Sequence, residues 1–276
     1  MPTIGSSQRD AMITDRVLQL EGVHNFRDYG GYAVSGGGRL RSAHLWRSGQ
    51  HHGATEADLA RIAELGLASV FDLRSSVERT THPCRRPDSF AAIIHFAEDE
   101  NIHKAAHNAP HIQAAAAAPR QRDAASTREG MRRNYGHIAF RPGLTAMMGK
   151  MLAELAKGRG PSLVNCMAGK DRTGIAVAMV QLAVGVHRDD IIADYLLTNT
   201  AGDVEARIAA GARTIKDITG QADEDVMRVL MGVEAEYLES AFDMIAERHG
   251  SIDAYLAEVL GADDALRSRL RDALVV

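Results

Sequence analysis

The pattern of apolar and polar positions starts, in residues 25–49, with short apolar pieces separated by Gly pairs and triplets. Such spacing is typical of a hairpin-like start to a sheet. Residues 55–66 begin with Thr55, carry Asp58 three positions later, place apolar side chains at helical spacing and end at Gly66. This arrangement predicts a helix with an N-terminal capping box and a glycine stop.

Apolar runs without helical spacing predict the strands of a sheet. Residues 68–74 and 91–96 follow the first helix, and residues 161–166 follow a second helical stretch at 140–158. Alternating strands and helices favour an α/β fold in which a central, mostly parallel sheet is flanked by helices. We expect a single domain of this kind over residues 1–276.

The rest of the chain is irregular or helical by its pattern. Residues 98–141 are rich in Ala and charge and are interrupted by Pro, which predicts surface helix and loop rather than core. From Asp189 onward the pattern is helical throughout. The candidate breaks in this part are Gly211, Gly220, Gly232 and Gly250.

Composition narrows the class of protein. Apolar residues make up 45% and charged residues 25% of the 276 positions, which is ordinary for a soluble enzyme. The net charge of -4 provides no basic field, so we expect no nucleic acid as a partner. No apolar stretch has the length of a membrane span, and no signal-peptide pattern is present at the start, so the expected location is the cytoplasm.

The histidines and cysteines do not form a metal-binding pattern. The histidines that recur at multiples of four are His95, His103, His107 and His111. Pro110 would break the helix that aligns them, and two cysteines cannot build a four-cysteine site. We expect no metal and no cofactor. Cys84 is interpreted as a solvated loop thiol, with a protective disulfide to Cys166 as the alternative.

The segment NCMAGKDRTG, residues 165–174, joins a predicted strand to an apolar helix and carries the candidate chemistry. Cys166 follows the strand, and Arg172 stands six positions later, which is the spacing Cys-x5-Arg. The N-terminus of the following helix presents free N–H groups and the positive end of its dipole. Together with a guanidinium these groups bind phosphate and favour a thiolate, which can attack phosphorus and form a phosphocysteine.

Each neighbour in this loop suits a task. The candidate substrate-binding residues are Met167, Ala168, Gly169, Lys170, Thr173 and Gly174. Gly169 permits unusual dihedral angles and a close approach of the backbone to an oxyanion. Lys170 adds a second positive charge, and Thr173 places a hydroxyl within reach of the sulfur. Asp171 can protonate the leaving oxygen and then activate water.

The segment CMAGKDRTG resembles the phosphate-binding loop of the cysteine-dependent protein tyrosine phosphatase superfamily, in particular of its bacterial members with Cys-x-Ala-Gly-Lys-Asp-Arg-Thr-Gly. The pieces NFRDYGGY, LWRSG, VFDLRSSVE and DYLLTN stand in the order which that family shows. They cover most of the chain from Val23 to Asn199. The resemblance implies a tyrosine phosphatase-like fold and hydrolysis of phosphotyrosine and, variably, of phosphoserine, phosphothreonine and phosphoinositides.

The resemblance also implies roles for single residues. Cys166 is the nucleophile, Arg172 the phosphate clamp and Lys170 a contact to phosphate or to a lipid headgroup. Asp171 is the candidate general acid. Because many members take their acid from a separate loop, Asp72 and Asp99 are the alternatives.

One position departs from the family pattern. Members commonly have His immediately before the cysteine, where it orders the loop and tunes the thiolate. This chain has Asn165, which hydrogen-bonds to the backbone but supplies no positive charge. We expect a consequence for the rate rather than for the type of reaction.

Polar residues outside the loop have supporting roles in this interpretation. Asn25, Arg27 and Asp28 are expected to organise the N-terminal turn or to line the cleft. Arg47, Asp72 and Arg74 stand at predicted strand ends and are expected to form buried ion pairs or to support loops.

The resemblance further suggests a helical lid at about residues 201–235, with an ordinary peripheral helical hairpin as the alternative. Its candidate apolar underside consists of Met227, Leu230, Met231 and Val233. An exposed apolar face there would suit a lipid substrate or one carried by a membrane.

Two functional hypotheses follow. The first is a phosphatase of phosphorylated proteins, above all at phosphotyrosine, with a phosphoinositide phosphatase as the alternative within the enzyme class. The second is a pseudophosphatase that binds phosphorylated partners without turnover because Asn165 has weakened the chemistry. The intact Cys166, Asp171, Arg172 and Thr173 favour the first. A sulfurtransferase is disfavoured, because Lys-Asp-Arg-Thr-Gly at the start of a helix is a phosphatase pattern.

Overall fold

The computed structural model describes residues 16–97, 123–206, 208 and 223–276. Its centre is a five-stranded sheet with the strand order β1-β2-β5-β3-β4. The strands are β1 (Arg27–Asp28), β2 (Leu45–Ser48), β3 (Ser69–Asp72), β4 (Ile93–Phe96) and β5 (Ser162–Asn165). β1 pairs antiparallel with β2, as the hairpin-like start predicts, and the other pairs are parallel. The expected α/β fold with a mostly parallel sheet is confirmed.

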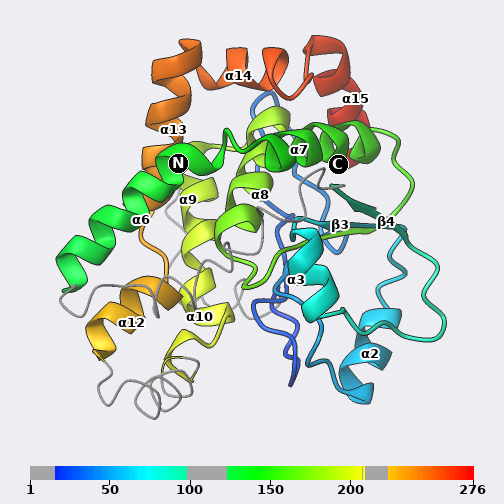
Figure 1. Ribbon diagram of the computed structural model, residues 1–276. Helices are drawn as coiled ribbons and strands as arrows, with labels where there is room; N and C mark the ends of the chain where they lie inside the picture. The colour runs from blue at the N-terminus through cyan, green and yellow to red at the C-terminus, as the bar shows by residue number, and fades with distance from the viewer. Residues whose placement is uncertain (1–15, 98–122, 207, 209–222) are drawn as a thin grey trace, which may run out of the picture.

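Helices lie on both sides of the sheet (Figure 1). They are α2 (Glu56–Ala63), α3 (Ser76–Thr81), α6 (Ala124–Ile138), α7 (Pro142–Leu155), α8 (Asp171–Val184), α9 (Arg188–Leu196), α10 (Thr198–Ala201), α12 (Glu224–Met231), α13 (Ala235–His249), α14 (Ile252–Glu258) and α15 (Asp264–Leu274). α2 has Thr55 as its N-cap and a capping box with Asp58, which confirms the predicted start of this helix.

The C-terminal part of the chain is helical in its described residues, as predicted. Gly232 ends α12 and Gly250 ends α13, which confirms two of the four expected breaks. Gly211, Gly220, Asp99, His103, His107 and His111 lie outside the described residues. Within the described ranges no helix combines the length and the apolar character that crossing a membrane requires.

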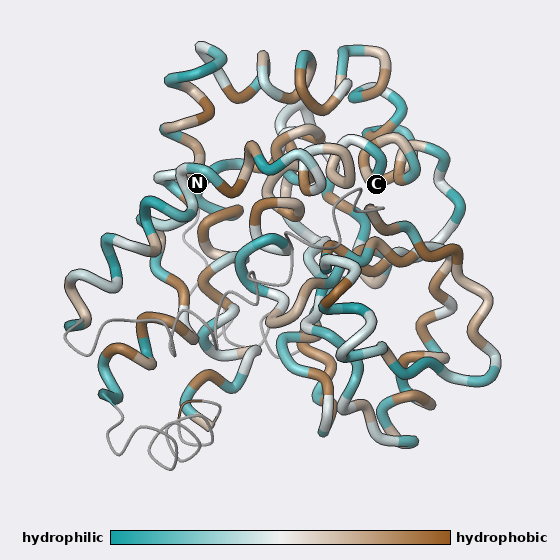
Figure 2. Tube along the Cα trace, in the orientation of Figure 1, coloured by the Kyte–Doolittle hydropathy of each residue, from teal (hydrophilic) through white to brown (hydrophobic). Residues whose placement is uncertain are grey.

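Successive residues of the strands enter two different apolar clusters, because side chains alternate between the faces of a sheet. Val70 of β3 and Leu163 of β5 pack in one cluster with Leu59 of α2. Their neighbours Phe71 and Val164 belong to the larger cluster that contains α7 and α8. Figure 2 shows hydrophobic residues gathered along the strands and central helices. Both faces of the sheet are thus covered, as parallel sheets require.

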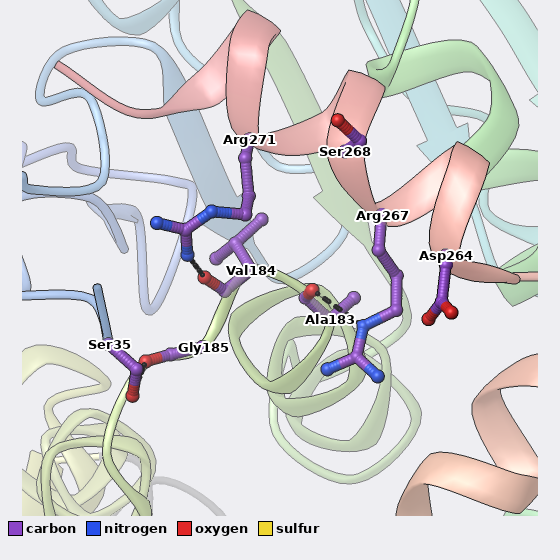
Figure 3. A pocket seen from close by; sticks show the side chains of 8 residues that line it. All are labelled: Ser35, Ala183, Val184, Gly185, Asp264, Arg267, Ser268 and Arg271. Atoms are coloured by element: carbon purple, nitrogen blue, oxygen red, sulfur yellow. Dashed lines mark hydrogen bonds between the residues drawn. The ribbon is translucent and has the colours of Figure 1, made fainter. Parts of the chain in front are cut away.

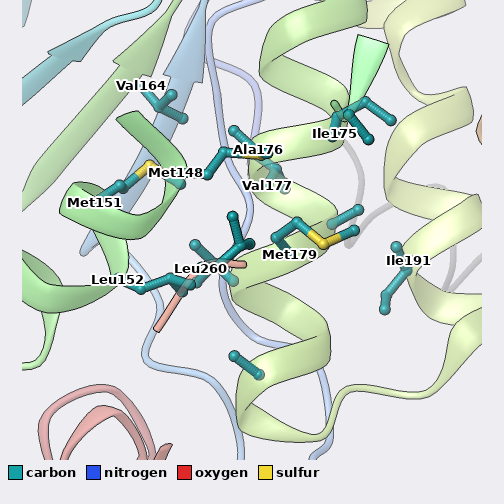
Figure 4. Close-up of a cluster of buried hydrophobic side chains, with 14 of the residues drawn as sticks. Met148, Met151, Leu152, Val164, Ile175, Ala176, Val177, Met179, Ile191 and Leu260 are labelled. Carbon is teal, nitrogen blue, oxygen red and sulfur yellow. The ribbon is translucent and has the colours of Figure 1, made fainter. Parts of the chain in front are cut away.

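α8 is the central helix of the larger cluster, and all but two of its 14 residues are buried. Figure 4 shows Ile175 and Met179 of α8 in the same cluster as Met148 and Met151 of α7. A helix that is buried around nearly its whole circumference has little freedom to shift. Its first turn is therefore held in a fixed position next to the end of β5.

Residues 124–138 correct one expectation. Their pattern indicated surface helix or loop, but α6 buries Met131, Tyr135 and Ile138 in the large cluster, next to α13. The prediction was wrong because the positions between these three are Arg, Asn, Gly and His, which hide the helical spacing of the apolar residues. α6 thereby brings Tyr135 to the start of α8.

A surface pocket of about 340 Å³ lies at the C-terminal end of α8. In Figure 3, Arg267 and Arg271 of α15 donate to the carbonyls of Ala183 and Val184. Cations at a helix C-terminus interact favourably with the negative end of its dipole, so the two arginines cap α8. A helix of this length spans about 20 Å. The pocket is therefore remote from the loop that precedes α8.

Candidate active site

The loop of residues 166–170 connects the end of β5 to the start of α8. β5 lies between β2 and β3, and the strand register pairs Asn165 with Ser48 on one side and with Asp72 on the other. Cys166 follows directly and is 2% exposed. It therefore stands at the carboxyl edge of the parallel strands, where open α/β sheets bind their ligands.

The carbonyls of this loop are held by donors from other segments. Gln50 N–H donates to the Met167 carbonyl over 3.0 Å. Asn25 Nδ2 and Arg47 Nη2 donate to the Gly169 carbonyl over 2.7 and 3.1 Å. In a trans peptide the N–H points opposite to the carbonyl of the same peptide, so the N–H groups of Ala168 and Lys170 point away from these donors. This leaves them on the side of the loop where an anion can be bound.

Gly169 is required at its position for two reasons. Its φ of +67° is in the left-handed region that L side chains rarely adopt. A Cβ would also lie 2.4 Å from the Ser48 carbonyl and 2.5 Å from the Gly49 nitrogen. Gly174 has a related role one turn later, since a Cβ there would lie 2.9 Å from the Tyr195 ring. The loop packs this closely only because both positions lack side chains.

Arg172 lies in the first turn of α8 and is clamped by Glu78. Its Nη1 and Nη2 donate to the two carboxylate oxygens of Glu78 over 2.6 and 2.7 Å, and Nη1 also donates to the Leu73 carbonyl over 3.1 Å. Burial alone would lower the pKa of Arg172, but the hydrogen bonds to Glu78 and the nearby Cys166 sulfur raise it above its ordinary value. The guanidinium is thus permanently charged and held in one orientation.

Glu78 also caps α3, so a single carboxylate connects that helix to Arg172. Ser75 N–H donates to Glu78 Oε2 over 2.8 Å in a capping box. Burial acts to raise the pKa of Glu78, but hydrogen bonds from Arg172 and Ser75 outweigh it and hold the pKa below its ordinary value. The Ser-x-x-Glu spacing in VFDLRSSVE was the available signal in the sequence. It indicates a helix start but does not reveal the arginine partner.

A buried ionic network holds the donors that grip Gly169. Asp194 of α9 accepts from Arg47 over 2.9 Å and lies 3.7 Å from Arg27. Arg27 also donates to the side chain of Asn25. Burial, followed by the charge of Arg47, lowers the pKa of Arg27 to about 9, so this guanidinium stays charged at neutral pH. The buried ion pair expected for Arg47 is confirmed, and breaking such a pair costs about 3–5 kcal/mol.

The N-terminal turn is organised by Asp28. Its two carboxylate oxygens accept from the N–H groups of Gly30 and Ala43 over 2.8 and 2.6 Å. Asn25 has a different role: it adopts a φ of +59°, is buried, and its side chain donates to the Gly169 carbonyl of the loop. The expected organisation of the N-terminal turn is therefore confirmed for Asp28, and Asn25 supports the loop from behind rather than lining a cleft.

Asp72, at the end of β3, is held by Arg74. Nε and Nη2 of Arg74 donate to the two oxygens of Asp72 over 2.8 and 2.7 Å, and both side chains are almost fully buried. The expected ion pair is confirmed here as well. Asn165, the residue before the cysteine, donates from Nδ2 to Asp72 Oδ1 over 3.4 Å. Asn165, at the position where the resemblance led us to expect His, thus contacts this pair.

Lys170 and Asp171 form a second charged pair at the start of α8. Lys170 Nζ lies 3.2 Å from Asp171 Oδ1, and Lys170 is fully buried. Tyr135 of α6 donates to the same Oδ1 over 2.7 Å. Lys170 Nζ also donates to the Gly232 carbonyl over 3.2 Å. The acid and the lysine of the loop therefore lie between α6 and the segment that follows α12.

The segment of residues 223–234 packs over this part of the loop. Besides the contact from Gly232, Val233 exchanges two hydrogen bonds of 2.9 Å with the side-chain amide of Asn199. A pocket of about 280 Å³ adjoins it and is lined by Arg128, Asn199, Val204, Glu205, Arg228, Val229, Gly232, Val233 and Glu234. The segment is thus fastened to α10 and to the loop lysine.

The expected apolar underside of this segment is largely covered. Met227 and Val233 are each 4% exposed, and Met227 packs against Val204 and Ile208. Leu230 and Met231 are half-buried. Of the lid expected at 201–235, residues 207 and 209–222 lie outside the described residues.

Thr173 and Cys84 differ in their surroundings. Thr173 is fully buried, and its Oγ1 has no hydrogen-bond partner in the part of the chain that the structure describes. Cys84 is half-buried and Cys166 is buried, and neither forms a disulfide, so the alternative of a disulfide between them is not realised. The Cys84 sulfur accepts the His51 N–H over 3.3 Å. Burial raises the pKa of Cys84 in spite of the nearby Arg74. Cys84 is therefore a protonated thiol at neutral pH.

Sequence reasoning missed four residues that contact the loop or its supports: Glu78, Tyr135, Asp194 and Tyr195. Asp194 and Tyr195 belong to DYLLTN, which carries part of the resemblance but gives no role to either residue. Tyr135 lies in the stretch that was interpreted as surface. The contacts of all four depend on the tertiary fold.

A Cys-x5-Arg loop between a central parallel strand and a buried helix, with its arginine fixed by a carboxylate, defines a cysteine-dependent phosphatase. The chain belongs to the tyrosine phosphatase family, whose sequence pattern matches residues 18–276. This membership confirms the expected fold and enzyme class.

Two relatives support the assignment along nearly the whole chain. Over 281 residues the chain is 34% identical to the triple specificity protein phosphatase PtpB of Mycobacterium tuberculosis, covering 94% of this chain and 99% of that protein. Over 251 residues it is 33% identical to a Cupriavidus necator protein whose name assigns it to the tyrosine-protein phosphatases, covering 90% of this chain and 85% of that protein.

Proposed function

We propose that this enzyme hydrolyses phosphotyrosine in proteins, and also phosphoserine and phosphothreonine, through a phosphocysteine on Cys166. The observation that carries the proposal is the arrangement around the loop. A buried cysteine at a strand end, outward-held carbonyls of Met167 and Gly169, and a clamped Arg172 surround one position for a phosphate. The name of the Mycobacterium tuberculosis relative, a triple specificity phosphatase, supports the broader range.

In the first step the Cys166 thiolate forms a bond to phosphorus while the bond from phosphorus to the leaving oxygen breaks. The leaving oxygen takes the electron pair and receives a proton from Asp171. Loop amides and the Arg172 guanidinium stabilise the charge on the other phosphate oxygens. In the second step water attacks phosphorus, Asp171 takes its proton, and the sulfur leaves as a thiolate. The buried hydroxyl of Thr173 stabilises that thiolate by hydrogen bonding.

We assign the acid role to Asp171 rather than to Asp72. Asp171 is the first residue of α8, directly after the loop and one residue before the phosphate clamp. Asp72 instead receives both Nε and Nη2 of Arg74, together with Asn165. Both oxygens of Asp72 are thus committed to holding Arg74, whereas Asp171 adjoins the residue that binds the phosphate.

We expect Asp171→Asn to lower kcat by about 10²–10³-fold for phenyl phosphate, whose leaving group is poor. For p-nitrophenyl phosphate the loss is smaller, about 10-fold, because a good leaving group departs with little help from an acid. Steady-state rates on the two aryl phosphates measure the difference. Asp72→Asn is the matched variant and should leave the ratio of the two rates unchanged. Equal losses on both substrates in Asp171→Asn would move the acid role to Asp72 or elsewhere.

Lys170 is the residue that we propose extends the range of substrates toward phosphoinositides. It is fully buried at the start of α8, and its ammonium contacts the Asp171 carboxylate and the Gly232 carbonyl. If this ammonium exchanges its present oxygen partners for a phosphate of the substrate, it can bind a second phosphate of a ligand that carries more than one. The residues of the segment 223–234 must shift for this contact to form.

A side-by-side assay on phosphotyrosine peptide, phosphoserine and phosphothreonine peptides and phosphoinositides tests the proposed range. We expect the wild type to turn over all classes, with phosphotyrosine the fastest. Lys170→Ala should reduce phosphoinositide turnover about 10-fold more than phosphotyrosine turnover, because it removes one charge-assisted contact. Lys150→Ala, which changes an exposed lysine of α7, is the control. A uniform loss in Lys170→Ala would contradict the lipid role.

A cover over the site is part of the same proposal. The contacts of Gly232 with Lys170, and of Val233 with Asn199, support the interpretation of residues 201–235 as a lid within one tyrosine phosphatase-like domain. Limited proteolysis with and without tungstate tests it, since a lid that opens for ligand changes its cleavage rate when the loop is occupied.

A further inference from the structure

Three side chains form a continuous hydrogen-bond chain that ends at the loop. Tyr195 Oη donates to Tyr135 Oη over 2.7 Å, and Tyr135 Oη donates to Asp171 Oδ1 over 2.7 Å. The two tyrosines come from α9 and α6, and they are 1% and 0% exposed. A buried hydroxyl costs free energy unless it forms a hydrogen bond, so the loss of either of these two hydrogen bonds would be unfavourable.

The direction of this chain is fixed. Burial, followed by the charge of Asp171, raises the pKa of both Tyr135 and Tyr195 well above the ordinary value for tyrosine. Both hydroxyls therefore keep their protons throughout the working pH range and serve as donors toward the carboxylate. The Lys170 ammonium lies 3.2 Å from the same Oδ1 and adds a positive charge next to it. Tyr135 and Lys170 thus hold Oδ1 of this carboxyl from two sides.

The ring of Tyr195 fits next to α8 because residue 174 is a glycine. The Tyr195 ring lies so close to Gly174, in the first turn of α8, that a Cβ there would be 2.9 Å from Cε2 and 3.0 Å from Cδ2. Tyr135 meets the Tyr195 ring edge-on, with 6.1 Å between ring centroids. The absence of a side chain at Gly174 therefore permits the close approach of Tyr195.

We propose that Tyr135 is a positioning residue for Asp171, supported by Tyr195: its hydroxyl holds Oδ1 and fixes the orientation of the carboxyl that exchanges a proton with the leaving group. This inference rests on the acid role proposed above for Asp171. During the first step the proton of the Asp171 carboxyl goes to the leaving oxygen, and Tyr135 and Lys170 stabilise the carboxylate that remains. In the second step the same carboxylate takes the proton from water.

Several charged and titratable groups lie around Asp171 and influence the pH dependence of the rate. Among the described residues, the charged and titratable groups that face it include Lys170 at the end of the loop, Arg172 of α8, Arg141 at the start of α7, Tyr135 of α6 and Tyr195 of α9. Of these, the tyrosines can lose their hydroxyls without a change of charge. Tyr→Phe substitutions therefore isolate the hydrogen bond from the electrostatics of the site.

The test is the pH dependence of kcat/KM for phenyl phosphate in Tyr135→Phe. A carboxylate that loses a donor holds its proton to higher pH, so the basic limb should move up by about 0.5–1 pH unit. kcat should fall about 10-fold because the carboxyl is no longer held in one orientation. Tyr195→Phe, which does not touch Asp171, should give a smaller shift in the same direction. In an Asp171→Asn background Tyr135→Phe should have no further effect on kcat, since the tyrosine acts through that carboxyl.

Tyr255→Phe is the matched control, because it removes another buried hydroxyl, which donates to the Ala139 carbonyl over 2.5 Å. It should lower the thermal stability without moving the basic limb. An unmoved limb in an active, folded Tyr135→Phe, or an equal kcat loss in the Asp171→Asn background, overturns the positioning role. The proposed phosphatase chemistry fails separately, through an inactive wild type or an active Cys166→Ser variant.

Discussion

Cys166→Ser is expected to reduce turnover of p-nitrophenyl phosphate by about 10⁴-fold or more while the loop still binds tungstate. A serine hydroxyl is not ionised at neutral pH and does not attack phosphorus, whereas a thiolate does. The groups that bind the anion are not changed by this substitution: they are the backbone amides of the loop and the guanidinium of Arg172. Steady-state rates measure the first effect, and calorimetric titration with tungstate measures the second.

Cys84→Ser is the control for Cys166→Ser, because it removes the other thiol of the protein, which we expect to have no catalytic role. Cys84 is half-buried, accepts the His51 N–H and lies outside the loop, so its replacement should leave kcat/KM within about 2-fold. An acid quench of the wild type during turnover should trap phosphate on Cys166 and not on Cys84. Residual turnover in Cys166→Ser at the wild-type level would remove the nucleophile assignment.

Parts of the fold that depend on local patterns could be predicted from the sequence. Thr55 and Asp58 fix the start of α2 because a capping box needs only residues three apart. The strand expected at 161–166 is β5, and the apolar run after Gly174 is the buried helix α8. The position of Cys166 between these two elements followed from the same patterns, because a strand, a short loop and a helix determine where the loop must lie.

The supports of the site could not be predicted, because they come from distant positions. Glu78 stands 94 residues before Arg172, and Tyr135 stands 36 residues before Asp171. The capping box of α3 does not reveal the partner of Glu78. The apolar spacing of α6, which is interrupted by polar residues, does not reveal the partner of Tyr135. The ion pair of Arg47 with Asp194 spans 147 residues in the same way. Such contacts are decided by how the helices pack and not by the local sequence.

Arg172→Lys is expected to lower kcat/KM by about 10²–10³-fold and to weaken tungstate binding. Both residues carry one positive charge, so the loss measures geometry. Two guanidinium nitrogens of Arg172 engage the two oxygens of Glu78, and this fixes the plane from which the phosphate is bound. A lysine offers a single point charge that meets either Glu78 or the phosphate. Wild-type kcat/KM in this variant would contradict the role of Arg172 as the phosphate clamp.

Glu78→Gln tests the contact between Glu78 and Arg172 by changing the carboxylate. It also predicts how the thermal stability depends on pH. The pKa of Glu78 is lowered in the folded protein, so its pairing stabilises the fold above the ordinary glutamate pKa of about 4.3. That contribution disappears as the pH falls through the lower, folded-state pKa. The wild type should therefore be more heat-stable than Glu78→Gln at neutral pH, and the difference should close in acid.

The same variant should also lose some activity. Because Arg172 keeps its charge but loses its ionic partner, Glu78→Gln should retain more activity than Arg172→Lys, about 10-fold below the wild type. A stability difference that persists unchanged in acid would show that the carboxylate charge does not hold the arginine.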